Sequence, residues 1–256
     1  SGHPGGSLGC ADLLTYLYNE RLTLNATSFS MDGLNEDLFF LSNGHISPVW
    51  YSVLARSGFF PVEELATFRK ISSRLQGHPS VDKNLPGIRM ASGSLGQGLS
   101  VAIGAATTKK MQGDDSMVYC LMGDGELQEG QVWEAAMYAG SKKINNLIGI
   151  IDYNNRQIDG DVSDVMGIMP LSDKWTAFGW EVYHMDGHSF DSMREVFAAI
   201  DANKSNGMPK MIIMKTEMGQ GVDFMMGTHA WHGKAPNDEQ LERALAQLQV
   251  TEHGDY

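Results

Sequence analysis

Short apolar segments alternate with helix-like segments along the chain, and this alternation limits the available folds more than any other feature. Apolar runs bounded by turn residues predict strands at 37–42, 117–122, 147–151, 180–185 and 211–215. Helical spacing and helix start signals predict helices at 8–22, 46–57, 95–111, 130–142, 190–203 and 238–249, with one more opened by Pro61. The pattern predicts an α/β fold with a mostly parallel sheet flanked by helices.

Length and charge narrow the class of protein. The 256 residues are 42% hydrophobic, which is enough apolar material for a sizeable core. The net charge is −12, so nucleic acid and anionic membranes are poor partners. Cys10 and Cys120 lie in no metal-binding or paired pattern, and no targeting segment or membrane-spanning run is visible. We therefore expect a cytoplasmic protein with two reduced thiols.

The strongest chemical signal is Gly123-Asp124-Gly125, which ends a predicted buried strand shortly before a predicted helix. Glycines allow close backbone approach, and a helix N-terminus offers free N–H groups to a phosphate. Asp124 adds a hard carboxylate oxygen. Asn154 follows it by 30 residues at the end of the next strand, and the Arg156 carbonyl comes two residues later. Two or three protein oxygens, completed by phosphate and water, are how Mg²⁺ is usually held.

Gly-Asp-Gly alone is weak evidence, because it occurs in many turns. Its pairing with an asparagine at this distance resembles the thiamine-diphosphate fingerprint. The resemblance implies that Asp124, Asn154 and the Arg156 carbonyl hold a divalent metal, Mg²⁺ or alternatively Ca²⁺ or Mn²⁺. It also implies that thiamine diphosphate contacts a set of residues at these strand ends: Gly123, Asp124, Gly125, Glu126 and Asn154.

Five further segments narrow the resemblance to the transketolase family. They follow the family order: SGHPG at 1–5, LSNGH at 41–45, GHP at 77–79, SLGQG at 94–98 and GTHAWHG at 227–233. Together they cover nearly the whole chain. The resemblance implies that residues 1–256 form a single domain, the diphosphate-binding domain of the thiamine-diphosphate-binding fold.

Four histidines in these segments are implied to line the funnel that leads to the cofactor's thiazolium ring: His3, His45, His78 and His229. Near-neutral imidazoles suit proton transfer to and from sugar hydroxyls, and they can hydrogen-bond a developing oxyanion. His45 and His229 are also expected to contact the cofactor, His229 on its diphosphate side. Whether His232 belongs to the site or to the framework stays open.

The loop at 93–95 is implied to lie beneath the cofactor, through Gly93, Ser94 and Leu95. Ser94 stands where the family commonly has proline, which puts the rigidity of the backbone there in question. Glu129 resembles a catalytic-site glutamate that meets its equivalent across the family's dimer. A carboxylate stabilised by a helix dipole would explain Glu129 equally well.

Other polar residues carry weaker predictions. Arg69 and Arg74 are candidates for the mouth of the substrate channel, although a solvated helix face accounts for at least one of them. His184, His188 and His253 lie in no motif, so we expect them to have ordinary surface or framework roles.

Full-length transketolases continue into a pyrimidine-binding domain and a third domain, whereas this sequence ends at Tyr256. It also begins at Ser1 rather than Met, so we expect native residues before it. The resemblance implies the N-terminal subunit of a split transketolase, inactive alone. Its partner would be a C-terminal subunit carrying the pyrimidine-binding domain, in a dimer of heterodimers. The implied reaction moves a two-carbon ketol unit from a ketose phosphate to an aldose phosphate.

Three other interpretations stay open. Another thiamine-diphosphate enzyme, such as 1-deoxyxylulose-5-phosphate synthase or an oxo-acid dehydrogenase α subunit, would share Gly-Asp-Gly but fits the flanking segments less well. A transketolase for a rare sugar would fit them. A non-catalytic cofactor-binding homologue is disfavoured by the intact histidines, and a Rossmann dehydrogenase by the lack of GxGxxG after the first strand.

Overall fold

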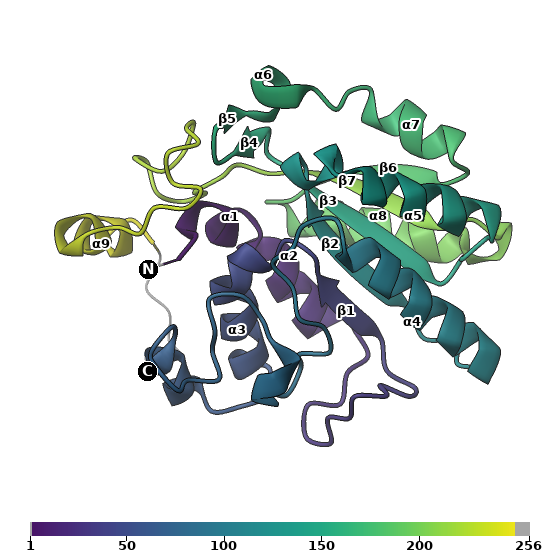
Figure 1. Cartoon of the computed structure of the whole chain (residues 1–256), viewed down its shortest axis with the longest axis horizontal. Coiled ribbons are helices and arrows are strands. Elements are labelled where there is room, and N and C mark those ends of the chain that lie inside the picture. Colours follow the sequence, from purple (N-terminus) through teal and green to yellow (C-terminus); the bar gives the residue numbers. More distant parts are fainter. Residues whose placement is uncertain (1, 249–256) are drawn as a thin grey trace.

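A sheet of five parallel strands forms the centre of the molecule. The computed structural model describes residues 2–248 and orders the strands β1–β2–β3–β7–β6. Their bounds are β1 Leu38–Leu41, β2 Val118–Gly123, β3 Leu147–Tyr153, β6 Glu181–Asp186 and β7 Lys210–Lys215. Every neighbouring pair in this sheet is parallel (Figure 1), which confirms the predicted α/β class.

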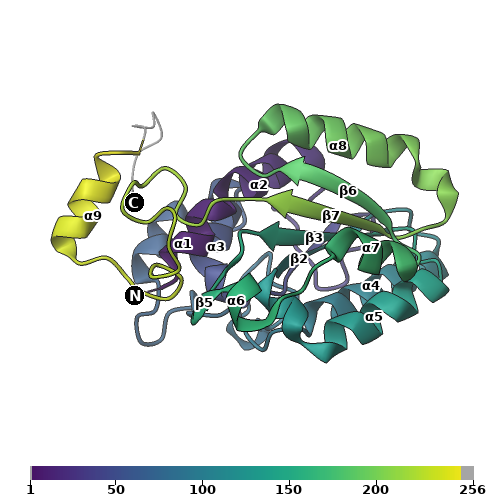
Figure 2. The ribbon, with the colours of Figure 1, turned by 90° about the horizontal axis from the view of Figure 1, so that it is seen from above.

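Helices cover both faces of the sheet. Figure 2 shows α2 (Ala11–Tyr16) and α8 (Phe190–Ala202) over one face, with α4 (Gly98–Gln112), α5 (Gly130–Ser141) and α7 (Leu171–Ala177) over the other. The chain steps one way across the sheet from β1 to β6 and then steps back to β7. Since parallel crossovers are right-handed, this reversal puts α8 on the opposite face from α4, α5 and α7.

Each face of the sheet has its own apolar core, because successive side chains of a strand point to opposite faces. In β2, Tyr119 and Leu121 join the core under α2 and α3 (Ser47–Arg56), whereas Cys120 and Met122 join the core under α4 and α5. Cys10 and Cys120 are both buried free thiols. Strands buried on both faces read as continuous apolar runs, which is how the sequence shows them.

The N-terminal helical region differs from its prediction. The helix expected at 8–22 begins earlier as α1 (Pro4–Gly9), breaks at Cys10, continues as α2 and ends in a π-helical turn at Leu17–Arg21. Pro4 suits the first turn of a helix, where its missing N–H costs nothing. The earlier start lets α1 carry the glycines after His3 into the interior.

Several short elements were not predicted. They are the hairpin of β4 (Arg156–Gln157) and β5 (Gly160–Asp161), together with α6 (Val162–Met166) and α7. The helix expected after Pro61 is a 3₁₀ helix at Val62–Thr67, and further 3₁₀ turns lie at Gly44–Ile46, Val81–Lys83, Gly125–Gln128 and Lys204–Asn206. These segments are too short for sequence periodicity to show.

The last described helix, α9 (Asp238–Leu245), starts where predicted. The Asn237 side chain accepts from the Gln240 N–H, and the Gln240 side chain accepts from the Asn237 N–H, which makes a capping box. The helix ends at Leu245, before the predicted end at residue 249, because residues 246–248 form a turn and a bend. Residues 1 and 249–256, among them His253, lie outside the described residues. Among residues 2–248, no helix is both long and apolar enough to cross a membrane.

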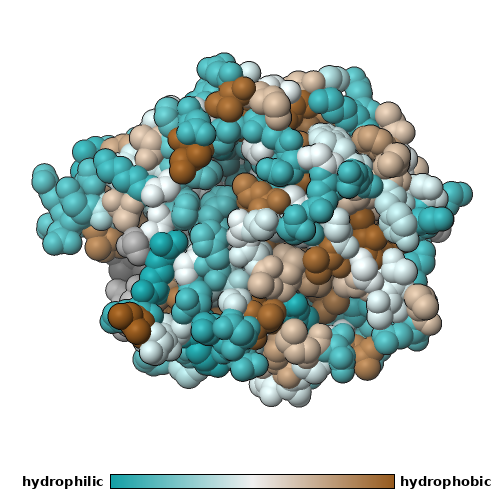
Figure 3. Space-filling view, in the orientation of Figure 1, coloured by the Kyte–Doolittle hydropathy of each residue, from teal (hydrophilic) through white to brown (hydrophobic). Residues whose placement is uncertain are grey.

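The surface that faces the viewer in Figure 3 mixes polar and apolar side chains. Hydrophilic side chains prevail over α9 at the left of this view, whereas apolar side chains elsewhere are scattered in small groups. Small scattered apolar groups are normal on a folded protein and indicate no particular partner.

Candidate functional site

A cavity of about 360 Å³ opens at the carboxyl ends of β2 and β3, the edge where open parallel sheets bind ligands. The N-terminal segment, the loop after β1 and the turns after β2 and β3 all contribute to it. Most of the predicted site residues line this cavity: His3, His45, Gly93, Leu95, Gly123, Asp124, Gly125, Glu126, Glu129, Asn154 and Arg156. The structure thus gathers residues that are far apart in the sequence.

Asp124 directly follows β2, and its side chain is only 1% exposed. Its carboxylate accepts hydrogen bonds from the backbone N–H groups of Gly125 and Asn155. Burial, and then the nearby Asp152 carboxylate, raise the pKa of Asp124 to about 7. A bound divalent cation would favour the ionised form, because it compensates for a buried negative charge.

Asp152 is a second buried carboxylate of the site, and the sequence analysis missed it. It is 3% exposed and accepts hydrogen bonds from the Thr216 hydroxyl and from the Asn154 amide nitrogen, 3.0 Å away. Burial raises its pKa as well. Because the Asn154 nitrogen is bound to Asp152, the Asn154 oxygen faces the other way and accepts from the Arg156 N–H at 2.8 Å.

The candidate metal ligands are therefore one carboxylate, one amide oxygen and one backbone carbonyl, from Asp124, Asn154 and Arg156. Within the described chain, no group of three or more His, Cys, Asp or Glu side chains could hold a metal ion. Mg²⁺ takes few protein ligands and completes its shell with phosphate and water oxygens. The donor set fits a metal that arrives with a diphosphate rather than one held by protein alone.

Glu126 was expected to contact the cofactor, but the protein itself uses both of its oxygens. The Ser42 hydroxyl and the Gly96 N–H donate to Oε1, the latter at 2.8 Å, and the Gly123 N–H donates to Oε2 at 3.1 Å. Glu126 is 2% exposed, and burial raises its pKa. Its three donors belong to the LSNGH, SLGQG and GDG segments, so Glu126 ties three motifs together beneath the cavity.

Four histidines form a cluster at the cavity: His3, His45, His78 and His232. The ring centroids of His45 and His232 lie 4.9 Å apart, those of His3 and His45 5.1 Å, and those of His3 and His232 5.9 Å. His78 stands at the edge of the cluster, 6.2 Å from His3. The four side chains come from four separate segments of the chain.

Crowding and burial keep these imidazoles neutral. Burial first, and then the His232 ring, lower the pKa of His3 to about 4 and that of His45 to about 3. Burial also lowers the pKa values of His78 and His232. A neutral imidazole has one donor nitrogen and one acceptor nitrogen, which is the state that proton exchange with a hydroxyl requires.

Several buried polar atoms around the cavity have no hydrogen-bond partner within the described chain: His3 Nδ1, His232 Nδ1, Asn43 Oδ1 and Ser92 Oγ. Leaving such an atom unpaired costs about 1–3 kcal/mol. Asn43 lines the cavity and Ser92 directly precedes Gly93. Unpaired polar atoms gathered in one place fit a polar ligand such as thiamine diphosphate at this cavity.

The loop at 93–95 reaches the cavity by a turn that only glycine fits. Gly93 has a φ of +135°, and a Cβ there would lie 2.9 Å from a ring carbon of His78. Leu95 lines the cavity, whereas Ser94 is exposed and is not among the lining residues. Its predicted cofactor contact stays a prediction.

His229 was expected to contact the cofactor on its diphosphate side, and this contact stays a prediction. His229 is exposed and absent from the cavity lining, while His232 lies in the histidine cluster. The buried Trp231, whose ring nitrogen donates to the Phe224 carbonyl at 2.7 Å, fixes the turn between them. Burial first, and then His229, lower the pKa of His232, so His229 lies near the edge of the histidine cluster.

The contacts of three other residues considered in the sequence analysis suggest no special chemistry. Glu129 lines the cavity but is exposed, and it makes no side-chain cap to α5. Arg74 is paired with Glu64 through two hydrogen bonds of 2.8 and 2.7 Å, so it serves the framework. His188 binds Asp12 at 3.0 Å and accepts from the Glu217 N–H at 2.9 Å, in keeping with the ordinary role expected of it.

Comparison with protein families gives one match, to the family described as transketolase, thiamine diphosphate binding domain, over residues 1–253. Among curated proteins, the chain is 39% identical over 249 residues to a subunit of the 6-deoxy-6-sulfo-D-fructose transketolase of Clostridium sp. (strain MSTE9), covering 97% of this chain and 88% of that protein. It is 38% identical over 248 residues to one of the subunits of the apulose-4-phosphate transketolase of Phocaeicola vulgatus, and the match covers 97% of this chain and 86% of that protein.

Solved structures give the same result. The chain superposes on the crystal structure of transketolase from Campylobacter jejuni with a TM-score of 0.86 and 37% identity, covering 96% of this chain. It spans 39% of that chain, and likewise 38% of human transketolase, to which it is 37% identical. The match to these longer proteins is therefore confined to about two fifths of their length.

Proposed function

The chain belongs to the transketolase family and matches its thiamine diphosphate binding domain, and on this premise we propose that it is the N-terminal subunit of a two-chain transketolase. In this proposal it binds thiamine diphosphate through a divalent cation, Mg²⁺ in the first place. With a C-terminal partner subunit it transfers a two-carbon ketol unit from a ketose phosphate to an aldose phosphate, in the cytoplasm.

The observation that carries the proposal is the joint presence of an oxygen donor set and a neutral histidine cluster at one cavity. Asp124, Asn154 and the Arg156 carbonyl would hold the metal and, through it, the diphosphate. Thiamine diphosphate, when bound, supplies the carbon that accepts the ketol unit. The remaining roles of this chain would be to position the cofactor and the substrate, to exclude water and to transfer protons.

The histidine cluster is suited to that proton transfer. His3 and His45 stay neutral at physiological pH, so each ring can take a proton from a sugar hydroxyl or hydrogen-bond a sugar oxygen. The unpaired nitrogens of His3 and His232 offer hydrogen-bonding capacity that no protein group uses within the described residues. Both roles suit a substrate that carries several hydroxyl groups, as a sugar does.

The relatives support a second chain in the active enzyme. Three of them are named as transketolase subunits, and this chain covers 86 to 88% of their length. We expect the partner to carry the pyrimidine-binding domain and the glutamate that activates the cofactor, and the two chains to form a dimer of heterodimers. The named sugars of these relatives, a sulfofructose and apulose 4-phosphate, make a specialised ketose a candidate substrate.

The proposal is tested by co-purification. A tagged chain is recovered from its native extract with thiamine diphosphate and Mg²⁺, and stoichiometric partners are identified by mass. We expect a second chain with a pyrimidine-binding domain, and ketol transfer only when both chains are present. Full turnover by the isolated chain would contradict the two-subunit proposal. Cofactor binding without any ketol transfer in the assembled pair would favour a non-catalytic homologue.

A further inference from the structure

Asp152 lines the cavity of about 360 Å³, the first cavity, yet both of its carboxylate oxygens already accept hydrogen bonds from the protein. The Thr216 hydroxyl donates to Oδ1, and the Asn154 amide nitrogen donates to Oδ2 at 3.0 Å. Asp152 is 3% exposed and Thr216 is 6% exposed. A buried carboxylate that is bound at both oxygens has a fixed direction, and it can fix the direction of a neighbouring ligand.

The Asn154 amide has two unlike ends, so its orientation decides whether it can bind a cation. The oxygen is an acceptor, whereas the nitrogen is only a donor. The nitrogen faces Asp152, and the oxygen accepts from the Arg156 N–H at 2.8 Å. This second bond closes the turn that carries the Arg156 carbonyl, another of the proposed metal ligands. The direction of Asp152 therefore affects two of the three proposed ligands.

Strand pairing places Thr216 beside Asp152. β3 and β7 are neighbouring parallel strands, and Asp152 pairs with Met214. Thr216 directly follows β7, and its N–H donates to the Tyr153 carbonyl at 3.3 Å. The Thr216 hydroxyl thus reaches Asp152 from the end of a paired strand, where the backbone is held on both sides.

Cys10 reaches the same carboxylate from the N-terminal helices. It lies at the break between α1 and α2 and is fully buried. Burial, then the Asp152 charge and a hydrogen bond to Asp152, raise the pKa of the Cys10 thiol, so the thiol keeps its proton and donates it. Because a thiol is a weaker donor than a hydroxyl, Thr216 is the stronger of the two anchors of Asp152.

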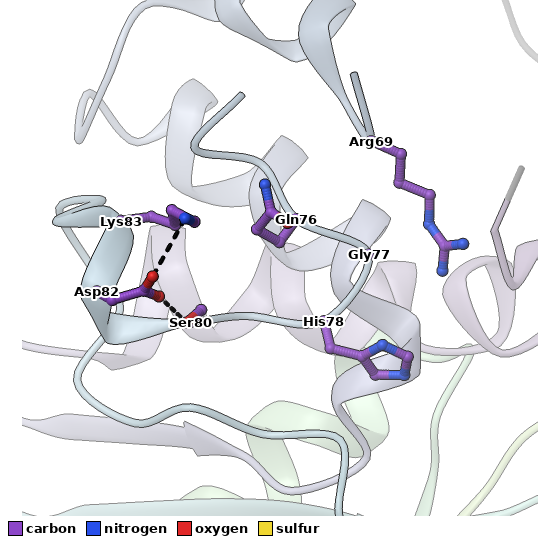
Figure 4. Close-up of a pocket in the computed structure, with 7 residues that line it drawn as sticks. All are labelled: Arg69, Gln76, Gly77, His78, Ser80, Asp82 and Lys83. Carbon is purple, nitrogen blue, oxygen red and sulfur yellow. Dashed lines mark hydrogen bonds and ion pairs between the residues drawn. The ribbon is translucent and has the colours of Figure 1, made fainter. Parts of the chain in front are cut away.

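The surroundings of a hydroxyl–carboxylate pair decide what it can hold in place. Figure 4 shows another such pair in a second cavity, of about 750 Å³, where the Ser80 hydroxyl donates to the Asp82 carboxylate and Lys83 lies 3.1 Å from it. The Asp82 side chain is 63% exposed, so water can replace the Ser80 hydroxyl. The buried pair of Thr216 and Asp152 has no such substitute.

We infer that Thr216 and Cys10 are positioning residues of the proposed metal site. Acting through Asp152, they keep the oxygen of the Asn154 amide, and not its nitrogen, available to the divalent cation. The inference rests on the proposed function, because it requires a cation at the three proposed ligands. It adds to that function two residues that act through another side chain.

The test uses Mn²⁺, because this ion takes the same oxygen ligands as Mg²⁺ and is visible to electron paramagnetic resonance. The whole chain, assembled with its partner subunit and thiamine diphosphate, is titrated with Mn²⁺. Thr216→Val replaces the hydroxyl by a methyl group, and we expect the Mn²⁺ affinity to fall about 10- to 100-fold. Thr216→Ser keeps the hydroxyl and should restore most of the affinity. Unchanged affinity in Thr216→Val overturns the inference.

Water-proton relaxation separates positioning from a general loss of structure. At saturating Mn²⁺, it reports how many water molecules the ion binds. If the Asn154 oxygen turns away in Thr216→Val, water takes its place and the relaxation rate rises. A rate equal to that of the unsubstituted chain means that Mn²⁺ has kept its ligands, which contradicts the inference.

Ser80→Ala is the matched control, because it breaks the exposed hydroxyl–carboxylate pair of the second cavity. It should change neither the Mn²⁺ affinity nor the relaxation rate. Cys10→Ala is the second test variant, and it should lower the affinity by less than Thr216→Val does. If Thr216→Val fails to assemble, unchanged affinity in Cys10→Ala overturns the inference.

The inference and the proposed function fail separately. If the unsubstituted pair binds Mn²⁺ with the cofactor and Thr216→Val binds it equally well, the positioning role is wrong and the proposed function stands. If Thr216→Val loses affinity as expected but the unsubstituted pair transfers no ketol unit to any sugar, the proposed reaction is wrong and the positioning role stands. If the unsubstituted pair binds no Mn²⁺, both are wrong.

Discussion

The two halves of the first cavity differ in how far this chain completes them. The carboxylate cluster, formed by Asp124, Glu126 and Asp152, is at most 3% exposed, and every member accepts hydrogen bonds from the protein. The histidine cluster, formed by His3, His45, His78 and His232, is more exposed and keeps unpaired ring nitrogens within the described residues. The protein therefore supplies hydrogen bonds to every carboxylate, whereas it leaves part of the hydrogen-bonding capacity of the histidines unused within the described residues.

This difference separates two kinds of role. The carboxylate cluster concentrates negative charge where water is excluded, so it gains most from a cation. The histidine cluster is neutral and keeps ring nitrogens without a partner in the described residues, which suits groups that exchange protons with a substrate. We therefore expect substitutions in the carboxylate cluster to change binding and stability, and those in the histidine cluster to change pH dependence.

The largest expected effect is that of Asp124→Ala on cofactor binding. The substitution removes a proposed metal ligand, and we expect the affinity for thiamine diphosphate with Mg²⁺ to fall at least about 100-fold. Because Asp124 is a costly buried charge, the free energy of unfolding without metal should not fall in parallel. Isothermal titration and chemical denaturation of the same samples separate the two quantities. Unchanged affinity would remove Asp124 from the metal site.

Glu126→Ala should come next, with an effect on stability. It leaves the Ser42 hydroxyl and the Gly96 and Gly123 N–H groups without their acceptor, which should lower the free energy of unfolding by about 2–3 kcal/mol. The matched control is Glu129→Ala, three residues away and exposed, which should stay within about 0.5 kcal/mol. Similar losses for both variants would show that Glu126 does not tie the motifs together.

Gly93→Ala should have a smaller effect that links the two clusters. The added Cβ meets the His78 ring and adopts a positive φ, which together should cost about 1–2 kcal/mol of stability. Gly113→Ala is the control, because Gly113 also has a positive φ but no atom lies within 4 Å of the added Cβ. Only Gly93→Ala should also shift the His78 imidazole resonances. If the His78 resonances are the same in both variants, residue 93 does not contact the His78 ring.

The smallest effect is a pH dependence set by His45. Its pKa in the folded protein, about 3, lies below the ordinary value of 6.5, so the unfolded chain binds more protons between these values. Stability should therefore fall as the pH drops below 6.5. His45→Gln should remove about 1 kcal/mol of that fall between pH 7 and pH 5, allowing for solvent screening. Denaturation at both pH values measures it, and His184→Gln, an exposed histidine, is the control.

Residues that are brought together by adjacent strands could be predicted from the sequence, whereas side-chain positions that depend on loop geometry were missed. Asp124 and Asn154 follow adjacent parallel strands, so their meeting at one sheet edge could be predicted. The direction of a side chain within a turn could not. The place of His232 in the histidine cluster goes with the burial of its neighbour Trp231, and the inward turn of Glu126 depends on three donors from distant segments.

The role of Asp152 could not be predicted from the sequence either. It lies inside an apolar strand two residues before Asn154, and only the tertiary structure shows that it fixes the Asn154 amide. Arg69 and Arg74 could not be told apart by sequence, because their difference lies in whether a carboxylate faces them. Glu64 faces Arg74, whereas the Arg69 guanidinium lies over the Phe68 ring.

The central claim is that this chain holds thiamine diphosphate through a metal bound by Asp124, Asn154 and the Arg156 carbonyl. Equilibrium dialysis of the cofactor against the chain assembled with its partner tests it most directly, with Mg²⁺ and with EDTA. We predict one cofactor per chain with Mg²⁺, and loss of binding both with EDTA and in Asp124→Ala. Binding that is equally tight with EDTA, or unaffected by the substitution, would contradict the claim.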